Sequence, residues 1–102
     1  MKNYYVYYWK KLVDFRRVNK RIFDENYVFV KIVQANSPEE VFANMQGEIW
    51  SPNGEVRDYI QWLGLTHTSM SVGDILFCPE ESPAHLMADM IGFQELPFYL
   101  TE

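Results

Sequence analysis

The chain has 102 residues and a formal net charge of −5, and this length suits one domain with a single hydrophobic core. Hydrophobic residues form 48% of the sequence and aromatic residues 17%, which excludes an intrinsically disordered protein. The single cysteine, Cys78, excludes an intrachain disulfide, and no apolar run approaches the ~20 residues of a membrane-spanning helix.

The charges divide the chain into two unequal parts. Residues 1–34 carry eight basic and three acidic side chains, whereas residues 35–102 carry one basic and eleven acidic side chains. Such asymmetry indicates either two faces with different partners or two halves that lie side by side and attract each other. We slightly favour the second interpretation.

The N-terminal third predicts strands. Met1 to Asn3 leads directly into aromatic residues without a signal-peptide pattern, so we expect a cytoplasmic protein that does not contact membranes. Tyr4 to Trp9 and Tyr27 to Val33 are rich in Tyr, Val and Ile, which favour strands. Residues 16–23 fit either a strand or a helical turn, and we expect them to form a hairpin with the strand that starts at Tyr27.

Two helices are predicted in the middle of the chain. In the first, at 37–46, Ser37 can cap the N-terminus, Pro38 suits the first helical position, and Gly47 would end the helix in a left-handed conformation. The second, at 55–63, has an apolar stripe at helical spacing and stops at Gly64.

The C-terminal third combines a hydroxyl-rich loop with strands. Gly73 and Asp74 suit a tight turn before the apolar strand Ile75–Cys78, and residues 84–92 and 93–96 predict a return strand, continuous or kinked at Gly92. We therefore expect an α+β domain, an antiparallel sheet of four to five strands with two short helices.

The loop before this strand is the main candidate binding site, and its members are His67, Thr68, Ser69, Ser71, Gly73 and Asp74. Its hydroxyls can either satisfy backbone groups in a tight turn or face a ligand. Side chains of this kind more often serve the turn, so the structural interpretation comes first.

The same loop carries a resemblance to a known family. Residues 67–76, followed later by 91–96, resemble the core signature of YodL-like domains. The positions that match are Ser69, Ser71, Val72, Asp74, Gly92 and Phe93. The resemblance covers about residues 27–96 and implies a small accessory protein of a phage or another mobile element, in a family without a settled activity.

An enzymatic function ranks last among the hypotheses. Acid–base or nucleophilic groups are present, namely His67, Ser69, Ser71, Asp74, Cys78, His85 and Asp89, but their spacing matches no catalytic motif. The two histidines, with Asp74 or Asp89, also match no standard metal-site spacing. We therefore assign no catalytic residue, no metal and no cofactor.

Binding functions remain. The basic side chains at 10–21 could contact nucleic-acid phosphates, and these are Lys10, Lys11, Arg16, Arg17, Lys20 and Arg21. A pI near 4.9 argues against a dedicated nucleic-acid-binding protein, and the acidic remainder could instead imitate DNA toward a host enzyme. Abundant Tyr, Trp and Met favour a protein-binding module, with a host protein or a second copy of the chain as partner. In that case the protein acts in the host cytoplasm.

Overall fold

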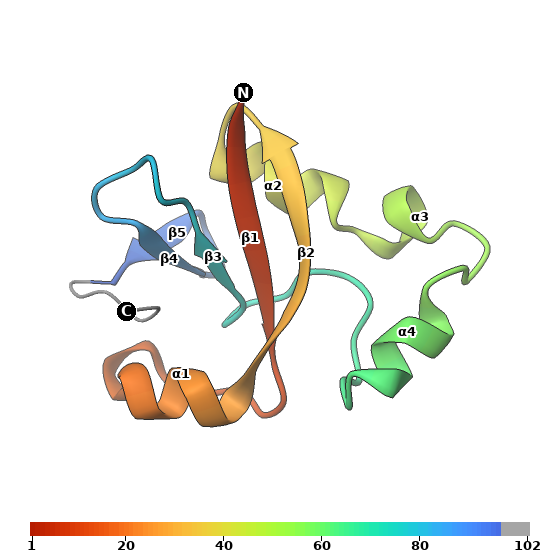
Figure 1. Ribbon diagram of the computed structural model, residues 1–102, viewed down its shortest axis with the longest axis horizontal. Coiled ribbons are helices and arrows are strands. Elements are labelled where there is room, and N and C mark those ends of the chain that lie inside the picture. The colour runs from red at the N-terminus through yellow and green to blue at the C-terminus, as the bar shows by residue number, and fades with distance from the viewer. Residues whose placement is uncertain (97–102) are drawn as a thin grey trace.

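The computed structural model describes residues 1–96, which form one five-stranded antiparallel sheet in the order β2-β1-β3-β4-β5 (Figure 1). The strands are β1 (Lys2–Trp9), β2 (Tyr27–Ala35), β3 (Ile75–Phe77), β4 (His85–Ala88) and β5 (Phe93–Glu95). The helices are a 3-10 turn η1 (Phe15–Arg17), α1 (Lys20–Asn26), α2 (Pro38–Asn44), α3 (Gly47–Trp50) and α4 (Arg57–Trp62). The predicted α+β class is confirmed, with four short α-helices in place of two.

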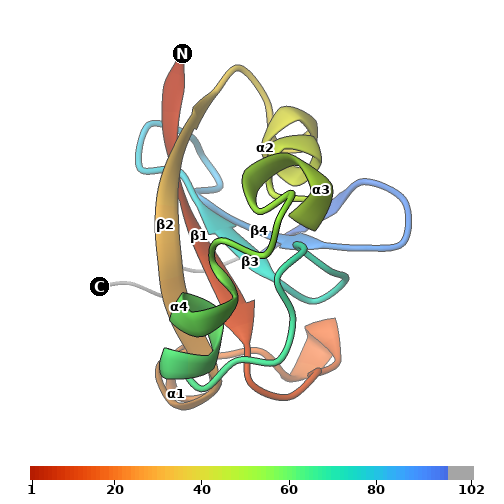
Figure 2. The same ribbon diagram turned by 90° about the vertical axis from the view of Figure 1, so that its right-hand side faces the viewer.

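Strand β1 organises the sheet, because it pairs with β2 on one side and with β3 on the other. Its side chains alternate between two faces, as the pleat of a strand requires. Tyr4, Val6 and Tyr8 are buried in the main core, on the face that Val41 of α2 and Ile60 of α4 cover. Figure 2 shows α2 and α3 stacked on that side of β1 and β2.

The opposite face of the sheet has a second, smaller core. The chain between β1 and β2 packs against this face near the end of β1 and the start of β2. It buries Val18 and Phe23 together with Tyr27, Ile75 and Met87. Farther along the same face, Phe29 and Ile32 of β2 stay 41% and 46% exposed. Residues 10–26 therefore cover part of this face of the sheet and leave the part around Phe29 and Ile32 open.

Three sequence-based expectations were wrong in detail. Residues 16–23 do not form a hairpin strand, because Asn19 accepts a hydrogen bond from the Ile22 amide and starts α1. Gly47 does not end a helix with a positive φ but begins α3. The predicted return strand is two strands, β4 and β5, which turn at 89–92.

Other expectations at the helix ends are confirmed. The Ser37 hydroxyl accepts the amide N–H of Glu40 at 3.2 Å, and Pro38 occupies the first turn of α2. Gly64 has a φ of +78° directly after α4, which is the left-handed conformation expected there. Among residues 1–96, no helix is long and apolar enough to cross a membrane.

Candidate functional site

The hydroxyl-rich loop closes around the carboxylate of Asp74, which is fully buried. This carboxylate accepts the backbone N–H of Ser71 at 2.7 Å and that of Trp9 at 3.0 Å. The Nε2 of His67 lies 3.0 Å and 3.1 Å from its two oxygens. Burial raises the pKa of the Asp74 carboxyl, and the bonds from His67, Ser71 and Trp9 oppose that rise. One side chain thus ties the loop to the end of β1.

Two rings of β1 clamp the histidine of this pair. The His67 imidazole stacks on Tyr8 with ring centroids 4.5 Å apart, and the Trp9 ring lies 4.3 Å away on a tilt. Its Nδ1 is buried, and within residues 1–96 nothing hydrogen-bonds to it. In a catalytic His–Asp pair, the nitrogen turned away from the carboxylate must face a nucleophile or substrate. Here that nitrogen is closed off.

The hydroxyls of Ser69 and Ser71 are engaged by the protein itself. The Ser69 Oγ accepts the amide N–H of Gly47 at 2.7 Å, and the Ser71 hydroxyl donates to the Ser69 carbonyl at 3.0 Å. The carbonyl of Thr68 accepts both the Tyr8 hydroxyl at 2.7 Å and the Trp50 indole N–H at 3.0 Å. These bonds join β1 and both ends of α3 to the loop.

Gly73 meets a double requirement at the end of the loop. Its φ is +94°, and a Cβ added there would lie 2.6 Å from Leu12 and 3.1 Å from the Trp9 indole. Its carbonyl accepts the Tyr27 hydroxyl at 2.7 Å. The geometry of the whole loop is therefore that of a structural lock, and it presents no assembled nucleophile, base and open cavity.

The remaining acid–base candidates, Cys78, His85 and Asp89, do not join the His67–Asp74 pair. Cys78 lies beyond the far end of β3, Asp89 lies in the β4–β5 turn, and His85 is buried on β4 among aromatic rings. Across the part of the chain that the structure describes, no three His, Cys, Asp or Glu side chains gather as metal ligands would.

Half of the cations of the basic segment pair with nearby carboxylates. Arg16 pairs with Asp14, and α1 holds two ion pairs one helical turn apart, Lys20 with Asp24 and Arg21 with Glu25. Between the basic and acidic parts of the sequence, Lys2 and Glu81 form the one carboxylate–cation bridge found within residues 1–96. Attraction between two oppositely charged halves is thus a minor feature of this fold.

A surface that the sequence did not single out is the turn between β4 and β5. Met90 is 86% exposed and Ile91 94% exposed, side by side at its tip. Turns favour Gly, Asn, Asp, Ser and Pro, so two large apolar side chains at a turn tip are unusual. From the sequence, Met90 and Ile91 were assigned to the predicted return strand, so their exposure in a turn was not anticipated.

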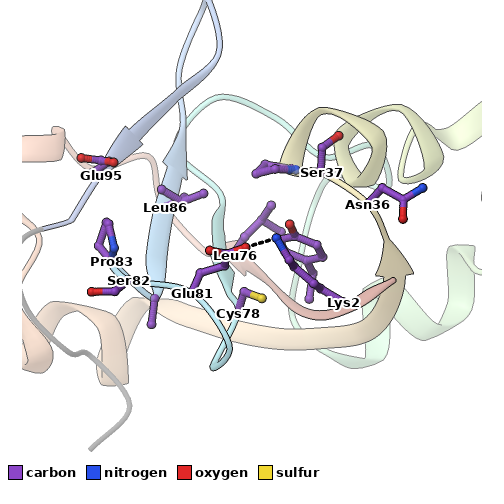
Figure 3. A pocket seen from close by; sticks show the side chains of 13 residues that line it. Lys2, Asn36, Ser37, Leu76, Cys78, Glu81, Ser82, Pro83, Leu86 and Glu95 are labelled. Atoms are coloured by element: carbon purple, nitrogen blue, oxygen red, sulfur yellow. Dashed lines mark hydrogen bonds and ion pairs between the residues drawn. The ribbon is translucent and has the colours of Figure 1, made fainter.

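A second feature without a linear signature is a pocket at the other end of the same hairpin. Its wall combines Tyr4 of β1, Cys78, the loop after it, Leu86 of β4 and the start of α2 (Figure 3). The lining residues come from four stretches of the sequence, 2–4, 36–38, 76–86 and 95, so no spacing in the sequence could have revealed the pocket.

Comparison with protein-family models, curated proteins and solved structures finds no match for this chain. The resemblance to YodL-like domains therefore stays a prediction, and the function must be argued from the surface itself.

Proposed function

We propose that this protein is a non-enzymatic protein-binding module whose contact point is the tip of the β4–β5 turn. The observation that carries the proposal is the pair Met90 and Ile91, 86% and 94% exposed. Burial in a partner would stabilise the complex by roughly 1.5–3 kcal/mol for each side chain. Because neither contributes to the folded core, their exposure has no structural purpose in the free protein.

The turn holds the tip in a defined shape. The amide of Asp89 donates to the Gly92 carbonyl at 3.0 Å, and Gly92 has a φ of +70°. The Asp89 carboxylate accepts the Met90 amide at 2.8 Å and the Gln94 side-chain amide at 2.7 Å. A turn ordered in this way loses little conformational entropy when a partner binds it.

The charge around the tip indicates the chemistry of the partner. Met90 borders a shallow hollow that Phe42 and Phe93 also line. The carboxylates of Asp89 and of Glu39 in α2 lie at the same hollow. The bond from Gln94 lowers the pKa of the Asp89 carboxyl, so it stays ionised at neutral pH. The complementary surface is an apolar pocket with Lys or Arg at its rim. The resemblance to YodL-like domains implies a host protein, met in the host cytoplasm.

Site-directed photocrosslinking tests the proposal. A photoreactive amino acid at position 91, in cells that express the protein naturally, should give one discrete adduct that mass spectrometry identifies. The same probe at position 49, where Ile49 is 59% exposed on α3, is the matched control and should give none. With the purified partner, Ile91→Asp should weaken binding about 30-fold or more, as loss of a buried apolar anchor does.

Stability controls make the outcome unambiguous. Ile91→Asp should leave the melting temperature unchanged, because substitutions at fully exposed positions change stability by about 0.5 kcal/mol or less. Equal adducts at positions 91 and 49, or no adduct at 91, would overturn the proposal. An adduct of twice the chain mass would show that the partner is a second copy of this chain and not a host protein.

A further inference from the structure

The pocket beside Tyr4 is an open hollow of about 240 Å³. That space holds about eight waters, so it suits a ligand of roughly that many non-hydrogen atoms. Its floor is apolar. The apolar part of the lining includes Tyr4, Pro38, Leu76, Cys78, Ala84 and Leu86, and the polar part is formed by Lys2, Asn36, Ser37, Glu81, Ser82 and Glu95.

The walls of the pocket are fixed in the absence of a ligand. The amide of Cys78 donates to the Ala84 carbonyl at 2.8 Å, which closes the loop that forms one side. Leu76 of β3 is 1% exposed and pairs with Leu86 of the neighbouring strand. A preformed hollow whose exposed lining is mainly apolar is the usual form of a small-molecule site.

The hydroxyl of Tyr4 is a polar group at the pocket to which the described residues give no hydrogen-bond partner. Tyr4 is 2% exposed, yet within residues 1–96 its hydroxyl makes no hydrogen bond, whereas those of Tyr8, Tyr27 and Tyr59 each donate to a backbone carbonyl. Burial raises the pKa of the Tyr4 hydroxyl, so it stays protonated and can donate as well as accept. The buried side-chain atoms without a hydrogen-bond partner within residues 1–96 are histidine nitrogens, so the Tyr4 oxygen is still reached by solvent and is accessible to a ligand.

The charges at the pocket mouth favour an uncharged ligand. Lys2 is the one cation among the lining residues, and Figure 3 shows it joined to Glu81 across the mouth. Glu95 adds a further carboxylate on the opposite wall. An anion would compete with Glu81 for Lys2 and approach Glu95, and a cation would have to separate from its water to reach an apolar floor.

We infer that this pocket binds a small, uncharged, largely apolar molecule through one polar group that hydrogen-bonds to the Tyr4 hydroxyl. The site is distinct from the β4–β5 tip, because the register places Leu86 opposite Glu95 at the base of the hairpin and Ala88 opposite Phe93 next to the turn. Ligand binding and protein binding can therefore be tested separately.

Four probes of one ring size test the inference by NMR on the isotope-labelled protein: phenol, toluene, benzoate and benzylammonium. Phenol should shift the amide resonances of Tyr4, Cys78 and Leu86 in a saturable manner and bind more tightly than either charged probe. Tyr4→Phe should weaken phenol binding about threefold to tenfold, as loss of one hydrogen bond does, and leave toluene binding unchanged. Leu86→Trp, which fills the pocket, should abolish both.

The inference fails if no probe gives localised shifts up to its solubility limit. It also fails if Tyr4→Phe weakens phenol and toluene equally, because the hydroxyl would then have no specific role. Thermal unfolding of both variants verifies that they fold. Leu86 is only half-buried, so blocking the pocket there remains informative should Tyr4→Phe be unstable.

Discussion

Asp74 shows how much of this fold depends on one side chain. It is fully buried, and its two oxygens serve three groups, the backbone amides of Trp9 and Ser71 and the imidazole of His67. Trp9 lies 65 residues away along the chain, so this carboxylate connects the first strand to the loop that precedes β3. Removal of its acceptor capacity leaves buried donors without partners.

Asp74→Asn is therefore expected to destabilise the protein by about 2–4 kcal/mol, because the new amide NH2 would face N–H donors. Chemical denaturation measures the effect. Asp58→Asn, the same change at an exposed position of α4, is the control and should change stability by about 0.5 kcal/mol or less. An unchanged melting temperature in Asp74→Asn would reject the structural role and move Asp74 to the functional candidates.

His85 gives the protein a pH-dependent stability. It is 1% exposed, stacks on Phe77 with centroids 4.7 Å apart, and meets the edge of Phe23. Burial lowers its pKa from 6.5 to about 4. Below about pH 6.5 the His85 imidazole is protonated in the unfolded chain but stays neutral in the folded chain. Protonation therefore favours unfolding, and stability present at neutral pH is lost as the pH falls toward 4.

The expected loss is at most about 3 kcal/mol between pH 6.5 and pH 4. Urea denaturation across this range measures it, and His85→Phe, which keeps an aromatic ring on Phe77, should flatten the profile. The raised pKa of Asp74 acts with the opposite sign, but it titrates in both proteins and cancels in their difference. Superimposable profiles would show that His85 does not titrate as its burial implies.

At the scale of elements, the sequence predicted the central strands, α2, α4 and the hydroxyl loop, because each has strong local signals. It failed at 16–26. There, the apolar spacing fitted either a strand or a helix, while Asn19 as N-cap and the i,i+4 pair of Lys20 and Asp24 favoured the helix. Those capping and pairing signals were present and outweighed the β-branched residues.

The tip and the pocket were beyond sequence reasoning for different reasons. Met90 and Ile91 continue an apolar pattern, and only Asp89 and Gly92 around them are turn-forming residues. Tyr4 and Cys78 are 74 positions apart in the sequence and meet only because β1 pairs with β3 in a register that matches Tyr5 with Phe77. Register is a property of the folded sheet.

The basic segment gives a prediction at the same scale. Three of its six cations pair with the nearby carboxylates Asp14, Asp24 and Glu25, so only half remain for phosphates. We expect no appreciable binding of DNA or RNA oligonucleotides at physiological salt, measured by fluorescence anisotropy over a salt series. Tight binding that falls steeply with salt, and falls further when Arg16 and Arg17 are changed to Glu, would restore the nucleic-acid hypothesis.

The whole molecule is expected to be a monomer at micromolar concentration. The sequence anticipated a homodimer, and a sheet face is a surface that could form one, but residues 10–26 cover part of the open face. What remains centres on Phe29 and Ile32, both less than half exposed, against the ~800 Å² per partner of a stable interface. The β2 edge is obstructed as well, because the Tyr59 hydroxyl donates to the Val30 carbonyl at 2.6 Å.

Sedimentation equilibrium measures the association state. A dimer would contradict this prediction. If Ile32→Lys dissociated that dimer and Ile91→Asp left it intact, the contact would lie on the sheet face.

The position of β1 between β2 and β3 has a consequence for how the protein is made. β2 follows β1 within some twenty residues, but β3, which covers its other edge, begins at Ile75, and the Asp74 lock forms only with that segment. While the ribosome adds the intervening residues, one edge of β1 has no hydrogen-bonding partner, and Tyr5 and Tyr7 lack their neighbours Phe77 and Ile75. Long-range pairing of this kind slows folding, and an open aromatic edge is prone to aggregate. The nascent chain is thus most vulnerable just before the loop emerges, which is where chaperone protection would matter most.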